Sequence, residues 1–81
     1  MSHLILTEDE ERELKKLGMF LRELRINMNL TQKDVASDAN INVASIHNIE
    51  GSKVRYSLAV IYKLSKVYGI SMSQLFVDIE D

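Results

Sequence analysis

Uncharged side chains that can contact nucleobases are concentrated in one short segment, residues 43–48. The carboxamide of Asn48 can bind adenine through two hydrogen bonds, and His47 can donate to a guanine edge or to a phosphate. Val43 and Ala44 are small and apolar, so they could pack on thymine methyl groups. The segment therefore predicts base contacts. Asn48 could instead face solvent or contact a phosphate, and His47 could be an ordinary surface residue. The indication of base contact is weaker for Val43 and Ala44 than for Asn48.

A pair of short helices is expected to present these side chains. Thr31, with Asp34 three residues later, is typical of a helix N-cap and places the start of a helix at Gln32. Apolar residues then recur at helical spacing as far as Ala39. Asn40 follows where the chain must reverse, and asparagine tolerates the left-handed conformation that ends a helix.

The second helix of the pair is expected over residues 43–50. Asn42 is the predicted N-cap, and Ile46 and Ile49 would be buried on the side opposite the base-contacting residues. A helix that follows so short a turn must cross its predecessor steeply. Such a pair can offer its second helix to the major groove of DNA.

Caps and apolar periodicity predict further helices on both sides of this pair. Thr7 and Glu10 form a capping-box pattern at the start of a first helix of about 21 residues that ends near Asn29. Two more N-caps precede a helix closed by glycine and a short last helix: Ser57 and Ser71. The predicted fold class is all-α, a compact bundle of four or five helices.

Three segments together form a family pattern: LRELRINMNLTQKDVA, INVASIHNIEG and SLAVIYKLSKVYGISMSQLF. They extend from about Leu17 to Phe76, and they resemble the lambda-repressor-like family, the Xre and phage Cro/repressor class of transcriptional regulators. The resemblance implies a helix-turn-helix DNA-binding domain. The chain departs from the family at Asn29 and Asn40, where Gly is usual, and at Tyr56, where Pro is common. Basic residues or Gln are also more usual at the positions of its first two recognition-helix residues.

The resemblance also implies roles for three residues. Gln32 matches a family position that grips the phosphate backbone. Arg25 and Glu50 match positions that form an inward-facing ion pair, which would hold the recognition helix at a fixed angle. A solvent-facing Glu50 is the alternative.

Phosphate contacts are also expected from the residues themselves, because donors at helix starts and basic loops commonly supply them. Ser45 lies in the first turn of the predicted recognition helix, and Lys53, Arg55 and Tyr56 follow that helix. A solvated basic loop is the alternative for the last three.

Composition favours a single small domain over residues 1–81, because 81 residues at 46% hydrophobic can form one core. The absence of Cys excludes disulfides and thiolate zinc sites, and no apolar run approaches the ~18 residues of a membrane span. No signal peptide is recognisable, so a cytoplasmic protein is expected. Separated histidines and the lack of a glycine-rich phosphate loop argue against an enzyme, and no cofactor or metal is expected.

The formal net charge of −2 is unusual for a DNA-binding protein, but its distribution is not. Residues 14–77 contain nine basic and four acidic side chains, a net charge of +5. The remaining charge of −7 lies in the acidic ends, residues 8–13 and 78–81. These ends should lie away from the DNA phosphates, because salt screens charges beyond ~8 to 10 Å and the local charge therefore matters more than the total.

A two-fold dimer on a near-palindromic double-stranded DNA operator is expected, with half-sites ~34 Å apart. The family often pairs through its last helix, and apolar residues near the end of this chain exceed the needs of a small core: Ile70, Met72, Leu75, Phe76, Val77 and Ile79. Core packing is the alternative role for these six residues.

The predicted function is sequence-specific DNA binding by a dimeric transcriptional regulator that acts as a repressor or autoregulator. The alternative is an antitoxin or anti-regulator that uses the same fold to hold a protein partner. The apolar Val43 and Ala44 and the acidic ends favour that alternative.

Overall fold

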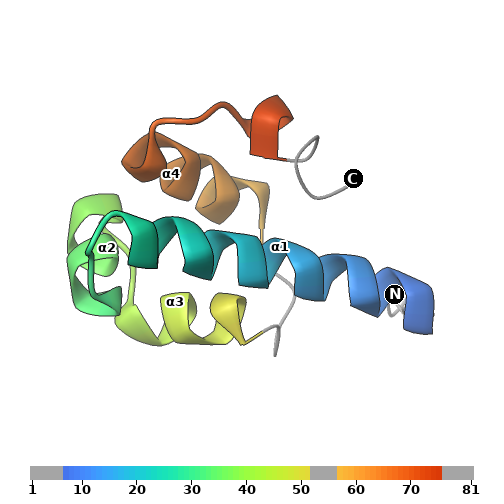
Figure 1. Cartoon of the computed structure of the whole chain (residues 1–81). Coiled ribbons are helices and arrows are strands. Elements are labelled where there is room, and N and C mark those ends of the chain that lie inside the picture. Colours follow the sequence, from blue (N-terminus) through green and yellow to red (C-terminus); the bar gives the residue numbers. More distant parts are fainter. Residues whose placement is uncertain (1–6, 52–56, 76–81) are drawn as a thin grey trace.

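The computed structural model describes residues 7–51 and 57–75, which form four α-helices and one further helical turn (Figure 1). The helices are α1 (Glu8–Asn27), α2 (Gln32–Ala39), α3 (Val43–Glu50) and α4 (Leu58–Tyr68), and the turn spans residues 72–75. The described residues contain no strand. The predicted all-α bundle is therefore confirmed.

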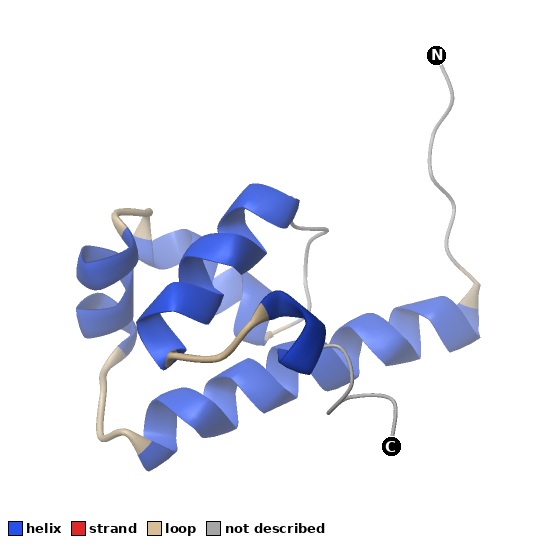
Figure 2. Cartoon of the chain, turned by 90° about the horizontal axis from the view of Figure 1, so that it is seen from above, coloured by secondary structure: helices blue, strands red, loops and turns tan. Residues whose placement is uncertain are grey.

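The first helix begins at a capping box, as its sequence predicts. The backbone nitrogen of Glu10 donates to Thr7 Oγ1 at 3.1 Å, and the backbone nitrogen of Thr7 donates to Glu10 Oε1 at 2.9 Å. The buried residues of α1 start only at Leu17, and Figures 1 and 2 show the first turns of the helix extending past the rest of the molecule. The capping box therefore stabilises a helix end that receives little support from packing.

Two asparagines close the turns on either side of α2. Asn29 has a φ angle of 58° and Asn40 a φ angle of 57°, both in the left-handed region. The backbone nitrogen of Ile41 then donates to the Ala36 carbonyl oxygen at 2.9 Å, which satisfies a carbonyl left open at the end of α2. The predicted left-handed conformation of Asn40 is confirmed, and Asn29 adopts the same conformation after α1.

The N-cap residues of the other helices also act as predicted. Thr31 and Asp34 form a second capping box, and these hydrogen bonds lower the pKa of the Asp34 carboxyl group. The Asn42 side chain accepts from the backbone nitrogen of Ala44 at 2.8 Å, and Ser57 accepts from that of Val60 at 3.3 Å. Local hydrogen bonds thus define where α2, α3 and α4 begin.

The core lies where α3 packs against α1 and α2, and where α4 packs against α2. Buried apolar side chains come from all four helices and from the 72–75 turn: Leu17, Leu21, Val35, Ala36, Ala39, Ile46, Ile49, Ile61, Leu64, Tyr68 and Leu75. This core fixes one side of α3 and leaves its other side exposed.

Replacing Asn40 tests the left-handed turn between α2 and α3. We expect Asn40→Ala to lower the free energy of unfolding by about 1 to 2 kcal/mol, because a Cβ-bearing residue without a short polar side chain is disfavoured at positive φ. Asn40→Gly should be neutral or stabilising. Urea denaturation measures both changes. Asn27→Ala, at the last residue of α1, is the matched control. An equal loss in the Gly and Ala variants at position 40 would contradict the role of backbone conformation.

Candidate nucleic-acid interface

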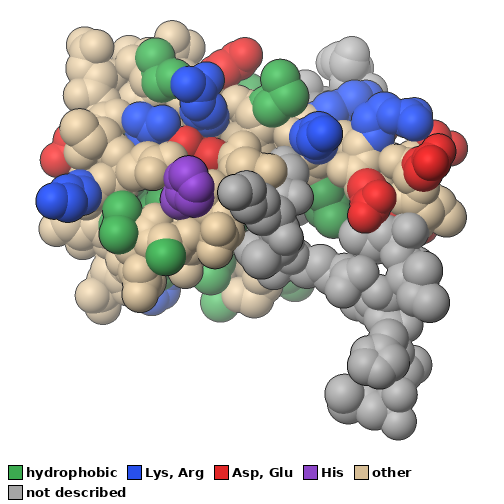
Figure 3. Space-filling view, turned by 90° about the horizontal axis from the view of Figure 1, so that it is seen from below, with side chains coloured by type: hydrophobic (Ala, Val, Ile, Leu, Met, Phe, Trp, Pro, Cys, Tyr) green, Lys and Arg blue, Asp and Glu red, His purple; other side chains and the backbone are tan. Residues whose placement is uncertain are grey.

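One side of α3 is exposed and carries no charged residue in its first six positions. Val43 is 40% exposed, Ala44 and His47 are also exposed, and Asn48 is half-buried. In Figure 3 the histidine lies on an open face with several Lys and Arg side chains around it, and acidic side chains lie both among them and towards the end where α1 begins. The structure thus brings the four predicted base-contacting residues to one accessible surface.

The opposite side of α3 ends in a buried ion pair between Arg25 and Glu50. Arg25 Nε donates to Glu50 Oε2 at 2.8 Å, and Arg25 Nη2 donates to Glu50 Oε1 at 2.9 Å. The side chains are only 13% and 3% exposed, respectively. The two parallel hydrogen bonds hold the guanidinium and carboxylate planes in one geometry.

Two further hydrogen bonds extend this pair to the other elements. Gln32 Nε2 donates to Glu50 Oε1 at 3.1 Å, and Arg25 Nη1 donates to the Leu30 carbonyl oxygen at 2.9 Å. Glu50 therefore connects α3 to α1 through Arg25 and to α2 through Gln32, while Arg25 also holds the turn between them. We call these residues, Arg25, Leu30, Gln32 and Glu50, the Glu50 network.

Burial and charge in the Glu50 network shift the protonation of its neighbours. The hydrogen bonds that Arg25 donates to Glu50 raise the pKa of the Arg25 guanidinium above its ordinary value, which keeps the guanidinium charged. Burial raises the pKa of the Tyr68 hydroxyl to about 12, with a further contribution from the negative charge of Glu50. Tyr68 therefore stays neutral beside the ion pair.

The described residues place only part of the predicted phosphate-binding set. Gln32 is half-buried at the first position of α2 with its amide nitrogen on Glu50, and Ser45 is half-buried in the first turn of α3. Lys53, Arg55 and Tyr56 lie outside the described residues. The Gln32 to Glu50 hydrogen bond had no local signal in the sequence, because the two residues are 18 positions apart.

The structure likewise describes only some of the residues predicted to form the dimer surface. Ile70 and Met72 are partly buried against the core, and Leu75 is 0% exposed within it. Phe76, Val77 and Ile79 lie outside the described residues. Leu75 therefore packs within its own chain and has no surface to offer a second copy.

Two other kinds of feature are absent from the part of the chain that the structure describes. Within 7–51 and 57–75 no group of His, Cys, Asp or Glu side chains is placed to hold a metal ion. No helix in those ranges combines the length and apolar character needed to cross a membrane.

Comparison with known proteins agrees with this geometry. A family model described as helix-turn-helix matches residues 21–75, which include α2, α3 and α4. The chain belongs to the helix-turn-helix family. The resemblance inferred from the sequence is thereby confirmed.

Two relatives within the helix-turn-helix family are named as transcriptional regulators. HTH-type transcriptional regulator PuuR of Escherichia coli (strain K12) is 35% identical over 63 residues, which cover 78% of this chain and 34% of PuuR. HTH-type transcriptional regulator DdrOP3 of Deinococcus deserti is 35% identical over 65 residues, which cover 80% of this chain and 50% of DdrOP3. The chain thus spans half or less of the length of these relatives.

Solved helix-turn-helix structures share the arrangement of these helices. Crystal structures of two single-residue variants of the restriction-modification controller protein C.Esp1396I each superpose with a TM-score of 0.76 at 20% identity. The superposition covers 84% of this chain and 88% and 86% of the two controller chains. At this identity the likeness shows a common fold.

Breaking the Arg25 and Glu50 pair on one side should be costly. We expect Arg25→Met or Glu50→Met to lower the free energy of unfolding by about 3 to 5 kcal/mol, because each leaves a buried charge without its partner. The double variant should lose less than the sum of the two single losses. Urea denaturation of the three variants completes the cycle.

The exposed pair of Arg12 and Asp9, also 2.8 Å apart, is the matched control for this cycle. Neutralising it should cost under about 1 kcal/mol, because solvent screens the charges. A Glu50→Met loss no larger than that of the control would contradict the stabilising role of the buried pair.

Proposed function

We propose that this protein binds double-stranded DNA sequence-specifically as a dimeric transcriptional regulator, acting as a repressor or autoregulator, with α3 in the major groove. The observation that carries the proposal is the two-sided character of α3. One side is held by the core and the Glu50 network, and the other is exposed, with Val43, Ala44, His47 and Asn48 on it.

The dimensions and chemistry of α3 support this placement. An α-helix with its side chains is about 10 to 12 Å across, and the major groove is about 12 Å wide and admits one such helix. Asn48 would bind adenine and His47 a guanine edge or phosphate, while Val43 and Ala44 would pack on thymine methyl groups. No charged side chain from the first six residues of α3 would be buried against the bases.

Phosphate contacts on both sides of α3 would complete the interface. Gln32 at the start of α2 and Ser45 at the start of α3 lie at helix N-termini, where backbone N–H groups and the helix dipole attract anions. Lys53, Arg55 and Tyr56 would add donors after α3. Gln32 would then serve twice, because its amide also positions Glu50.

A single α3 reads only about half of an operator, so we place the protein on DNA as a two-fold dimer. Half-sites on a near-palindrome would be ~34 Å apart, one helical turn of DNA. Ile70 and Met72, with Phe76, Val77 and Ile79 beyond the described residues, remain the proposed dimer contacts.

Selection of bound sequences from random duplexes, with wild-type protein and Asn48→Ala, tests this function. We expect the wild type to enrich a near-palindrome, and Asn48→Ala to lower affinity for it by about 1 to 3 kcal/mol and to lose preference at one adenine in each half-site. Asn27→Ala on α1 is the control. A loss below ~0.5 kcal/mol with unchanged preference would reject base contact by Asn48, and failure of the wild type to bind any duplex would reject the function.

The basic segment after α3 gives a separate expectation. Lys53→Gln and Arg55→Gln should each flatten the slope of log affinity against log salt concentration by ~0.9, because each phosphate contact releases condensed counterions. The preferred sequence should not change. Lys15→Gln on α1 is the control and should leave the slope unchanged, and an equal slope in all four proteins would count against phosphate contacts by residues 53 and 55.

A further inference from the structure

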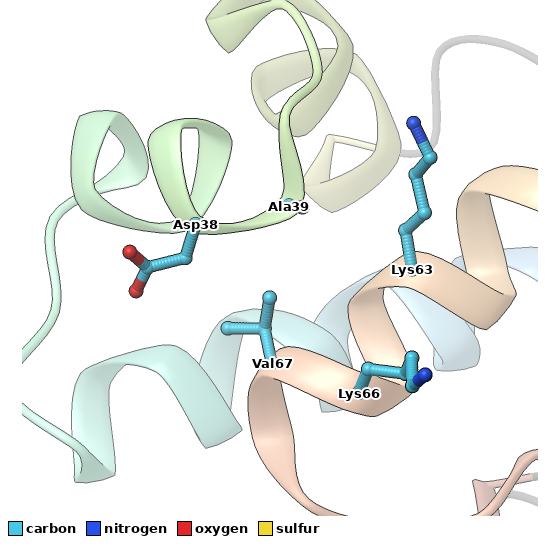
Figure 4. Close-up of a pocket in the computed structure, with 5 residues that line it drawn as sticks. All are labelled: Asp38, Ala39, Lys63, Lys66 and Val67. Carbon is cyan, nitrogen blue, oxygen red and sulfur yellow. The ribbon is translucent and has the colours of Figure 1, made fainter.

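A hollow between α2 and α4 lies away from the exposed side of α3. It has a volume of about 420 Å³ and is lined by Asp38, Ala39, Lys63, Lys66 and Val67. Figure 4 shows Val67 between the two helices, with the lysines along the α4 wall and Asp38 on the α2 wall. The volume lies within the range of about 300 to 1,000 Å³ that is common for binding clefts.

The outer surface of α4 beside the hollow exposes large apolar side chains. Leu58 is 70% exposed and Tyr62 is 51% exposed. Leu58, Tyr62 and Lys66 follow one another at intervals of four residues, so they share one side of the helix. Lys66 Nζ lies 5.3 Å from the centre of the Tyr62 ring. Exposed apolar residues next to a hollow are typical of a protein contact surface.

The basic charge of α4 favours an acidic partner. The sequence of α4, LAVIYKLSKVY, contains two lysines and no acid. Asp38 is the one acidic residue that lines the hollow. The salt bridges found within residues 7–51 and 57–75 do not involve Lys63 or Lys66. A partner segment with carboxylates would pair with Lys63 and Lys66, and aliphatic side chains would pack on Val67 and Ala39.

We propose that this hollow and the adjoining surface of Leu58 and Tyr62 receive residues 76–81 from a second copy of the chain. The sequence of that segment, FVDIED, combines three apolar with three acidic residues. This chemistry complements a hollow that combines the apolar side chains of Ala39 and Val67 with two lysines along one wall. The inference rests on the dimer proposed above and specifies the surface on which each copy receives the other.

The position of the 72–75 turn favours exchange between copies. In Figures 1 and 2, α2 lies on one side of α4 and the 72–75 turn lies on the other. The described part of the chain therefore ends at residue 75 on the side of α4 away from the hollow. Two chains related by a two-fold axis can exchange residues 76–81 reciprocally, which closes the assembly at two copies.

A labelled FVDIED peptide, measured by fluorescence anisotropy without DNA, tests the hollow directly. The receiving protein is the Asp78→Asn/Glu80→Gln/Asp81→Asn variant, in which the chain's own segment is neutral and the hollow is open. We expect it to be monomeric by sedimentation velocity while the wild type is dimeric, and to bind the peptide. Adding Lys63→Glu and Lys66→Glu should weaken peptide binding about tenfold or more, because two attractive contacts become repulsive.

A charge-swapped peptide, FVKIKK, provides the rescue. It should bind the Lys63→Glu/Lys66→Glu protein better than the protein with intact lysines, and this reversal is not expected from a folding defect. Lys15→Glu, an exposed lysine on α1, is the matched control and should leave binding of FVDIED unchanged.

The remaining outcomes overturn the inference in distinguishable ways. Equal binding of FVDIED with and without the lysines would place the segment elsewhere, and absence of peptide binding would exclude the hollow as its receptor. A wild type that is monomeric although the peptide binds would mean that the segment docks within its own chain. A monomeric wild type would also contradict the dimer proposed above, whereas loss of the hollow as receptor would leave that dimer and the duplex selection for α3 unaffected.

Discussion

The carboxylate of Glu50 is the point at which the separate helices of this protein are joined. It accepts two hydrogen bonds from Arg25 of α1 and one from Gln32 of α2, while belonging itself to the last turn of α3. A carboxylate with 3% of its surface exposed is stable only when donors of this kind surround it. Since those donors come from different helices, the carboxylate is satisfied in one arrangement of α1, α2 and α3, and that arrangement sets the direction of α3.

This constraint matters because α3 is too short to hold its own geometry. A helix of eight residues is unstable alone in water, so its conformation and angle come from what it packs against. Ile46 and Ile49 anchor it by burial, which is non-directional, whereas Glu50 supplies directed hydrogen bonds at its end. Together they immobilise one side of α3, so the exposed side needs no further ordering before it meets a rigid surface such as a DNA groove.

The sequence predicted the fold well where the signal was local. Thr7, Thr31, Asn42 and Ser57 each cap a helix through a neighbour two or three residues away, and Asn29 and Asn40 adopt the left-handed conformation at the turns. Contacts between distant residues carried no such pattern. Neither the Gln32 to Glu50 hydrogen bond nor the hollow between α2 and α4 has a local signature. The burial of Leu75 in the core likewise depends on contacts with residues distant in the sequence.

The proposed DNA-binding surface and the proposed dimer surface use different basic residues of this small chain. Lys63 and Lys66 lie on α4, which packs on α2, whereas α3 packs on α1 and α2 and lies on the other side of α1 in Figure 1. If these lysines hold the acidic segment of a partner copy, they do not serve DNA phosphates. The number of phosphate contacts per chain then stays low, and with it the salt-dependent part of the affinity. Two linked copies recover affinity by binding both half-sites at once, so dimer formation and operator binding would depend on each other.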